Sequence, residues 1–170
     1  MRSLFSVQRV VQARLEVVFM GKQGRQIFDD VCAPMRIGLF ASNAALAEYF
    51  VTALGLADHA VTLYPAVQDL FSGLAAAASR RGGAPHEVLL LELILDERGR
   101  QILARLSDLA KDLGLPIVVL TTAGRDAIGL AQAAFPALCL RQLPLPLRAL
   151  LALIQAQHQS VSPAALSSSE

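Results

Sequence analysis

The chain has 170 residues, of which 54% are hydrophobic and 17% charged, and its formal net charge is +1 at pH 7. This length suits one domain with a well-buried core, and the near-neutral charge gives no field that would attract nucleic acid or an anionic membrane. We therefore expect neither of these partners. The two cysteines, Cys32 and Cys139, match no metal-binding spacing, and no uncharged apolar run reaches the length of about 18 residues that a membrane span needs. A cytoplasmic protein with reduced cysteines is expected.

Residues 1–34 form an N-terminal extension with the pattern of an amphipathic helix. Its apolar residues recur at every third or fourth position. They are Leu4, Val7, Val11, Leu15 and Val18. The β-branched residues between positions 15 and 20 leave an extra strand as the alternative. Met35 and Arg36 repeat the Met-Arg at the start of the sequence, so whether residues 1–34 are native stays open.

From Met35 onward, short apolar segments alternate with helical ones. Strands are expected at residues 37–41, 59–64, 87–92, 117–121 and 137–140, and helices at 44–54, 65–80, 98–113, 124–135 and 146–158. Five β-α units in this length predict an α/β fold, the flavodoxin-like (βα)5 doubly wound parallel sheet with strand order 2-1-3-4-5. Residues 35–158 are expected to form this domain, and residues 159–170 a disordered tail.

The most continuous apolar run is EVLLLE, residues 87–92, which continues into Leu93, Ile94 and Leu95. A run with neither helical spacing nor alternation is typical of a central strand that helices cover on both faces. Glu92 lies where this strand should end, and in open α/β sheets ligands bind at the carboxyl ends of the strands. Glu92 is therefore expected at the functional edge of the sheet.

Residues 35–158 resemble the receiver domain of two-component response regulators. Four stretches carry the resemblance: MRIGLFASNAALAEYF, EVLLLELILDERGRQILARL, LPIVVLTT and LPLPLRALLALI. The resemblance implies a CheY-like response regulator domain in a phosphorelay. In such a domain, acidic residues after the first strand bind Mg²⁺, and an Asp at the end of the third strand accepts the phosphoryl group. A Thr or Ser after the fourth strand binds that group, and a Lys before a Pro after the fifth neutralises it.

The resemblance places Ala41 and Ser42 at the acidic positions, Glu92 at the phosphoacceptor position and Thr121 at the hydroxyl position. Mg²⁺ prefers carboxylate oxygens, which Ala41 and Ser42 do not offer. The extra methylene of Glu92 moves its carboxylate away from the geometry of in-line attack. Of the four functions, only the hydroxyl at Thr121 is retained.

The lysine position falls on Gln142 or Leu143, depending on whether Leu143 or Pro144 is matched to the proline. Neither side chain carries a charge, and the only lysines in the chain are Lys22 and Lys111. We therefore predict a degenerate pseudo-receiver that is not an enzyme, binds no metal or cofactor, and acts through protein partners.

Several candidate residues have two interpretations. Glu92 either mimics a phosphoryl oxygen together with Thr121, or is a strand-end acid in contact with water, which we favour. Ser42 and Asn43 either bind an anion at a helix N-terminus or only cap the helix, which we also favour. The histidines are expected at the surface: His59, His86 and His158.

The last helix has two apolar sides. One side is expected to cover the sheet and consists of Leu147, Leu150, Leu151 and Ile154; the other consists of Ala149, Ala152, Leu153 and Ala156. A solvated helix would place charges on the second side, and the preceding helix is also poor in them. This surface is expected to be a protein interface, for a homodimer, another signalling protein or residues 1–34. The resemblance agrees, because receivers commonly dimerise through it.

Two other classes of function were weighed. A small-molecule or cofactor-binding flavodoxin-like protein is the alternative, although residues 40–44 offer one hydroxyl and no glycine for a flavin phosphate. A transcription factor is less supported, because no helix-turn-helix pattern or basic face lies outside the receiver-like part.

Overall fold

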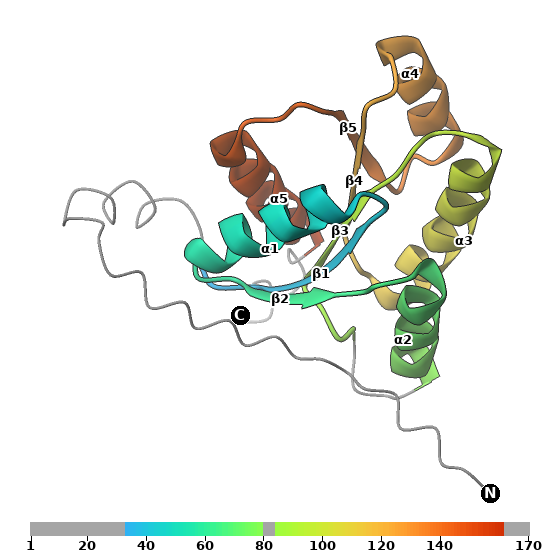
Figure 1. Cartoon of the computed structure of the whole chain (residues 1–170). Coiled ribbons are helices and arrows are strands. Elements are labelled where there is room, and N and C mark those ends of the chain that lie inside the picture. The colour runs from blue at the N-terminus through green and yellow to red at the C-terminus, as the bar shows by residue number, and fades with distance from the viewer. Residues whose placement is uncertain (1–32, 80–83, 162–170) are drawn as a thin grey trace, which may run out of the picture.

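The computed structural model describes residues 33–79 and 84–161 (Figure 1). Its strands are β1 (Arg36–Ala41), β2 (Ala60–Leu63), β3 (Val88–Glu92), β4 (Ile117–Thr121) and β5 (Cys139–Gln142). Its helices are α1 (Ala44–Leu56), α2 (Val67–Ser79), α3 (Glu97–Leu113), α4 (Arg125–Ala134) and α5 (Leu147–Val161). The predicted N-terminal helix lies outside the described residues.

The strands form one parallel sheet in the order β2-β1-β3-β4-β5, which confirms the predicted fold and topology. The register sets Ala41 beside Glu92 in the β1–β3 pair and Thr121 beside Gln142 in the β4–β5 pair. Because the strands are parallel, their carboxyl ends meet at one edge. The positions of the predicted site are thus brought to that edge by the sheet itself.

Helices cover both faces of the sheet, α1 and α5 on one and α2, α3 and α4 on the other (Figure 1). Every residue of β3 and of β4 is buried. Each of these strands supplies alternate side chains to the two core clusters: Leu89 and Leu91 pack toward α2 and α3, and Leu90 toward α1 and α5. This two-sided burial explains why β3 appears in the sequence as an unbroken apolar run.

The helix ends follow from local capping. The Asn43 side chain accepts hydrogen bonds from the backbone N–H groups of Ala45 (2.9 Å) and Leu46 (3.2 Å), so it is the N-cap of α1, as predicted. Asp96 caps α3 by accepting from Gly99 N at 2.7 Å. Helix α3 ends at Gly114, whose φ of 58° is the left-handed conformation that glycine adopts without strain.

Most elements begin or end one or a few residues away from the predicted bounds, and two of these differences concern the C-terminal part of the domain. Helix α5 continues to Val161, three residues into the segment expected to be a disordered tail, and residues 162–170 lie outside the described part. Strand β5 begins at Cys139, because the chain after α4 first turns through a hydrogen bond from Leu138 N to Phe135 O (3.1 Å).

The Gln132 side chain of α4 is bonded to the backbone of β5. Its amide Nε2 donates to Leu138 O at 2.6 Å, and its Oε1 accepts from Leu140 N at 3.0 Å. Since β5 is an edge strand of the sheet, these backbone groups have no neighbouring strand on that side. One side chain therefore occupies both hydrogen-bonding groups that face outward there.

The expectation that the histidines lie at the surface is wrong for His59 and His86, which are 5% and 6% exposed. His59 Nδ1 accepts from Met35 N at 3.2 Å, and its Nε2 has no hydrogen-bond partner in the described part of the chain. His86 lies against Gly38, where a Cβ atom would come within 2.6 Å of the ring, and a 2.6 Å hydrogen bond joins it to the Tyr64 hydroxyl. Burial lowers the pKa of both imidazoles.

Cys139 is a buried free thiol, as expected, and burial raises its pKa; Cys32 lies outside the described residues. No helix within residues 33–79 and 84–161 has the length and hydropathy needed to cross a membrane.

Candidate functional site

The site is built around the carboxylate of Glu92, at the carboxyl end of β3. This residue is 4% exposed, so the expectation of a strand-end acid in contact with water is wrong. Its Oε2 atom accepts hydrogen bonds from Ser42 N (2.9 Å), Ser42 Oγ (2.7 Å) and Asn43 N (3.2 Å). The carboxylate is held by three donors from a segment 50 residues earlier in the chain.

The segment between β1 and α1 is shaped to provide these donors. Ser42 N also approaches the backbone carbonyl of Glu92 at 3.3 Å, which continues the β1–β3 pairing one step beyond the strands. Asn43 uses its side chain to cap α1 and its backbone N–H to bind Glu92. The positive end of the α1 dipole lies at this point and favours a negative charge. The favoured interpretation, that Ser42 and Asn43 only cap the helix, is therefore wrong: Asn43 is the cap, and both residues also bind an anion, the carboxylate of Glu92.

The side chains at this edge do not fit the Mg²⁺ site of a receiver. The Ala41 side chain has no atom that can bind a metal, and the Ser42 hydroxyl donates a hydrogen bond to Glu92. The Asp96 carboxylate is the N-cap of α3. In the described ranges, no three His, Cys, Asp or Glu side chains come together as a possible metal site. Mg²⁺ requires a near-octahedral shell of oxygen ligands, and this edge of the sheet has too few free carboxylates to supply it.

The hydroxyl and lysine positions lie on the other side of β3. Thr121 is fully buried, and its Oγ1 accepts from Ala123 N at 3.3 Å. Gln142 is exposed and donates through Nε2 to Ala123 O at 3.1 Å, while Leu143 N donates to Thr121 O at 2.8 Å. Thr121 and Glu92 are thus bonded to different loops, and both Gln142 and Leu143 are uncharged.

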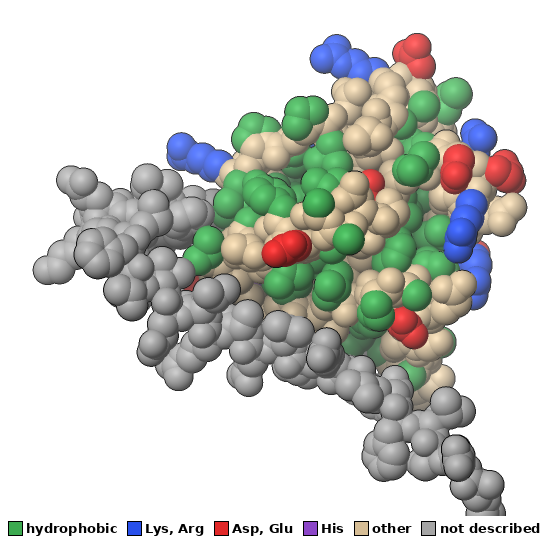
Figure 2. All heavy atoms as spheres, viewed as in Figure 1, with side chains coloured by type: hydrophobic (Ala, Val, Ile, Leu, Met, Phe, Trp, Pro, Cys, Tyr) green, Lys and Arg blue, Asp and Glu red, His purple; other side chains and the backbone are tan. Residues whose placement is uncertain are grey.

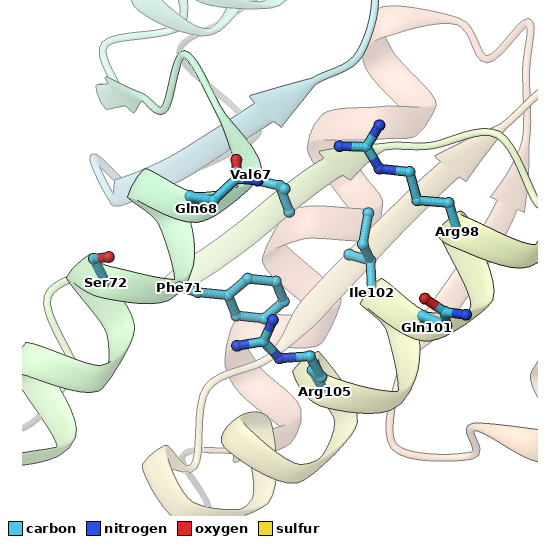
Figure 3. Close-up of a pocket in the computed structure, with 8 residues that line it drawn as sticks. All are labelled: Val67, Gln68, Phe71, Ser72, Arg98, Gln101, Ile102 and Arg105. Carbon is cyan, nitrogen blue, oxygen red and sulfur yellow. The ribbon is translucent and has the colours of Figure 1, made fainter.

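Sequence reasoning missed a groove that leads away from this edge. A cavity of about 360 Å³ opens beside Ser42 and extends over Ile94 to the start of α2. A second cavity of about 350 Å³ lies between α2 and α3 (Figure 3). Val67, Gln68, Arg98 and Ile102 line both cavities, so the two are continuous. The seven-residue spacing of Arg98 and Arg105 was the available signal, because it places both on one side of α3.

The predicted interface residues of α5 differ in exposure. Ala149, Ala152 and Ala156 are exposed, whereas Leu153 is half-buried and packs against the core between α5 and the sheet. On α4, Leu130 has 76% of its surface exposed. Figure 2 shows hydrophobic side chains over the region of α1 and α5 with acidic side chains among them, and most other charged side chains at the periphery and along the α3 side.

No protein-family model matches this chain, and no curated protein does. Similar solved structures include a putative pilus assembly-related protein from Burkholderia pseudomallei, at 16% identity and a TM-score of 0.58, which covers 74% of this chain and 90% of the other. The BeF3-activated N-terminal receiver domain of RstA from Klebsiella pneumoniae has 19% identity and a TM-score of 0.59, with coverage of 73% and 98%. Chemotaxis protein CheY4 from Vibrio cholerae has 18% identity and a TM-score of 0.54, with the same coverage. The chain therefore has the fold of response regulator receiver domains.

Proposed function

We propose that residues 35–158 are a pseudo-receiver: a domain of cytoplasmic signal transduction that acts by contact with other proteins and is not phosphorylated at the usual position. The observation that carries this proposal is the burial of the Glu92 carboxylate under three hydrogen bonds from Ser42 and Asn43. The atom at the phosphoacceptor position is thus already engaged by the protein.

Phosphoryl transfer to a carboxylate needs an exposed oxygen in line with the donor and cations that neutralise the developing charge. Glu92 is buried, and its Oε2 atom accepts hydrogen bonds from three donors, so this oxygen is not free to attack. The positions that would supply cations hold Ala41 and Ser42 for the metal ligands and Gln142 or Leu143 for the lysine. The accessible oxygen, the metal ligands and the lysine are each missing at a different position, so no single substitution restores phosphoryl transfer.

The same contacts suggest how such a domain functions without phosphorylation. Hydrogen bonds to a carboxylate are charge-assisted and stronger than neutral ones, so they fix the start of α1 to the end of β3. The edge then has one arrangement, independent of any phosphoryl donor. Partners would recognise a constant surface, and regulation would come from their availability.

The test is the intact mass of the full chain after incubation with acetyl phosphate and Mg²⁺, with a phosphorylatable receiver domain treated in parallel. No mass gain is expected for the wild type or for Glu92→Asp, because the metal ligands and the cation are missing in both. A gain of one phosphoryl group that is stable in acid and labile in base would contradict the proposal.

The α4-β5-α5 surface is the proposed contact, in a homodimer or with another signalling protein. The full chain is expected to exceed its monomer mass of 18.1 kDa by light scattering. Leu130→Glu and Ala152→Glu should return it to the monomer, because both side chains are exposed on this surface. Ala104→Glu, on the exposed side of α3, is the control and should leave the mass unchanged. Leu153→Glu is unsuitable, since Leu153 contacts the core. A wild-type chain that is monomeric at all concentrations would exclude the homodimer.

The cavity of about 360 Å³ beside Ser42 keeps a cofactor-binding role as the second candidate. Ligands of open α/β sheets bind at this edge. An absorbance spectrum and a flavin fluorescence scan of the purified chain distinguish a flavin-binding protein from a pseudo-receiver. A pseudo-receiver should show neither visible absorbance nor flavin fluorescence.

A further inference from the structure

The groove between α2 and α3 combines an apolar floor with a positive rim (Figure 3). Val67 and Phe71 of α2 and Ile102 of α3 line it with hydrocarbon. Arg98 and Arg105 stand along the α3 side, and both are exposed. The groove is open to solvent along its length and joins the cavity at the carboxyl edge of the sheet.

The two arginines have no acidic partner within salt-bridge distance among residues 33–79 and 84–161. The ion pairs formed there are Arg36 with Glu87 and Arg100 with Glu97, both outside the groove. Asp96, close to Arg98 at the adjoining cavity, caps α3 through Gly99 N and pairs with neither arginine. Both guanidinium groups therefore remain available to an acidic ligand.

Arg105 is also held in place. Its guanidinium carbon lies 4.0 Å from the centre of the Phe71 ring, a cation-π contact. This contact fixes the guanidinium beside the apolar floor while the N–H groups at its margin can still reach a ligand. A positioned arginine loses less side-chain entropy when it binds a carboxylate.

The dimensions indicate the kind of ligand. Arg98 and Arg105 are seven residues apart, which is two turns or about 10 Å along the helix. A single small anion cannot bridge that distance, whereas a helical segment with two carboxylates two turns apart matches it. The apolar floor between the arginines then receives the hydrophobic side chains of the same face, as in other helix-in-groove contacts.

We propose that this groove binds an acidic amphipathic helix of a partner protein, with its apolar side chains over Val67 and Ile102 and its carboxylates at Arg98 and Arg105. Residues 1–32 of this chain do not supply it, because they carry five basic and three acidic residues. A nucleic acid is also less suitable, since its sugar-phosphate backbone would lie on hydrocarbon. The proposal concerns a different surface from the α4-β5-α5 interface and does not depend on whether Glu92 is phosphorylated.

The experiment is a fluorescence anisotropy titration of the full chain with a labelled synthetic peptide of about 20 residues, which is longer than the roughly 12–15 residues at which isolated helices are only marginally stable in water. The peptide carries Glu at two positions seven residues apart, Leu between them on the same face, and Ala elsewhere. Its twin has Lys in place of each Glu. We expect the acidic peptide to bind at least about tenfold more tightly than the twin.

Four variants locate the contact. Arg98→Glu and Arg105→Glu should each weaken binding by about tenfold or more, while Arg100→Glu, on the same helix but outside the groove, should change it by less than about twofold. Arg105→Lys keeps the charge but loses the planar guanidinium that lies over Phe71, and should retain part of the affinity. Circular dichroism checks that each variant is folded.

No binding of the acidic peptide, equal binding of the twin, or an affinity that Arg98→Glu and Arg105→Glu leave unchanged would overturn the proposal. So would displacement of the peptide by millimolar inorganic phosphate, which would make the groove a site for a free anion. A change in the mass of the peptide-free chain caused by Arg98→Glu would assign the groove to a second copy instead. The acetyl phosphate test above gives its answer independently of all these outcomes.

Discussion

The Glu92 contacts make a quantitative prediction about folding stability. Glu92→Ala removes the acceptor of three hydrogen bonds and leaves Ser42 and Asn43 to find other partners. Hydrogen bonds to charged groups contribute about 1.5–3 kcal/mol each, but Ser42 and Asn43 are exposed, so water can replace part of what is lost. We expect the free energy of unfolding to fall by about 2–3 kcal/mol.

Glu92→Gln separates charge from shape. The amide oxygen can still accept from Ser42 and Asn43, so we expect a loss of only about 1 kcal/mol, the difference between charged and neutral acceptors. Ser42→Ala removes the 2.7 Å hydroxyl contact. Combined with Glu92→Gln in a double-mutant cycle, it should show a coupling of about 0.5–1 kcal/mol, since the two side chains are in direct contact.

The assay is urea unfolding followed by far-UV circular dichroism, because the chain has no tryptophan. Glu48→Gln is the matched control: Glu48 is exposed on α1, and its substitution should change stability by less than about 0.5 kcal/mol. If Glu92→Ala costs no more than this control, the carboxylate does not hold the β1–α1 segment, and the physical basis of the proposed constant surface is lost.

Burial lowers the pKa of His59 and His86 below 6.5, so on acidification the unfolded chain binds protons that the folded chain does not. The melting temperature should therefore be constant above about pH 6.5 and fall at lower pH. A melting temperature that stays constant down to about pH 5 would mean that both imidazoles are solvated. Gly99→Ala should destabilise the fold by at least about 3 kcal/mol, because its Cβ would overlap the carbonyl oxygen of Ile94 where the β3–α3 loop meets the helix. Gly129→Ala is the counterpart in α4, where a Cβ meets nothing within 4 Å, and should stabilise it by about 0.5–1 kcal/mol; urea midpoints decide both, and equal effects would contradict the packing argument.

The sequence predicted the sheet well because each central strand is buried on two sides, and that burial leaves a continuous apolar run in the sequence itself. It did not predict the environment of Glu92, because the donors that bury this carboxylate belong to Ser42 and Asn43, in a different β-α unit. A strand-end acid has the same local sequence whether water or another loop solvates it. Which donors it meets depends on the register of β1 against β3.

The same limit explains the histidines and the groove. His86 is buried because Gly38, on another strand, leaves room for its ring. Arg105 is exposed, and the aromatic ring beneath it comes from another helix, α2. Its role as part of a rim appears only when the two helices are packed side by side. Contacts between units, unlike burial within one, have no periodic pattern in a single sequence.

The Gln132 side chain has a consequence for how copies of this chain can associate. By bonding to Leu138 O and Leu140 N, it imitates the backbone of a sixth strand and closes the β5 margin at that point. Another polypeptide therefore cannot extend the sheet by strand addition at this point, and a partner that binds the α4-β5-α5 surface has to do so through side-chain contacts. Replacing Gln132 with Ala would leave the backbone groups Leu138 O and Leu140 N without this partner and open that part of the edge to strand addition.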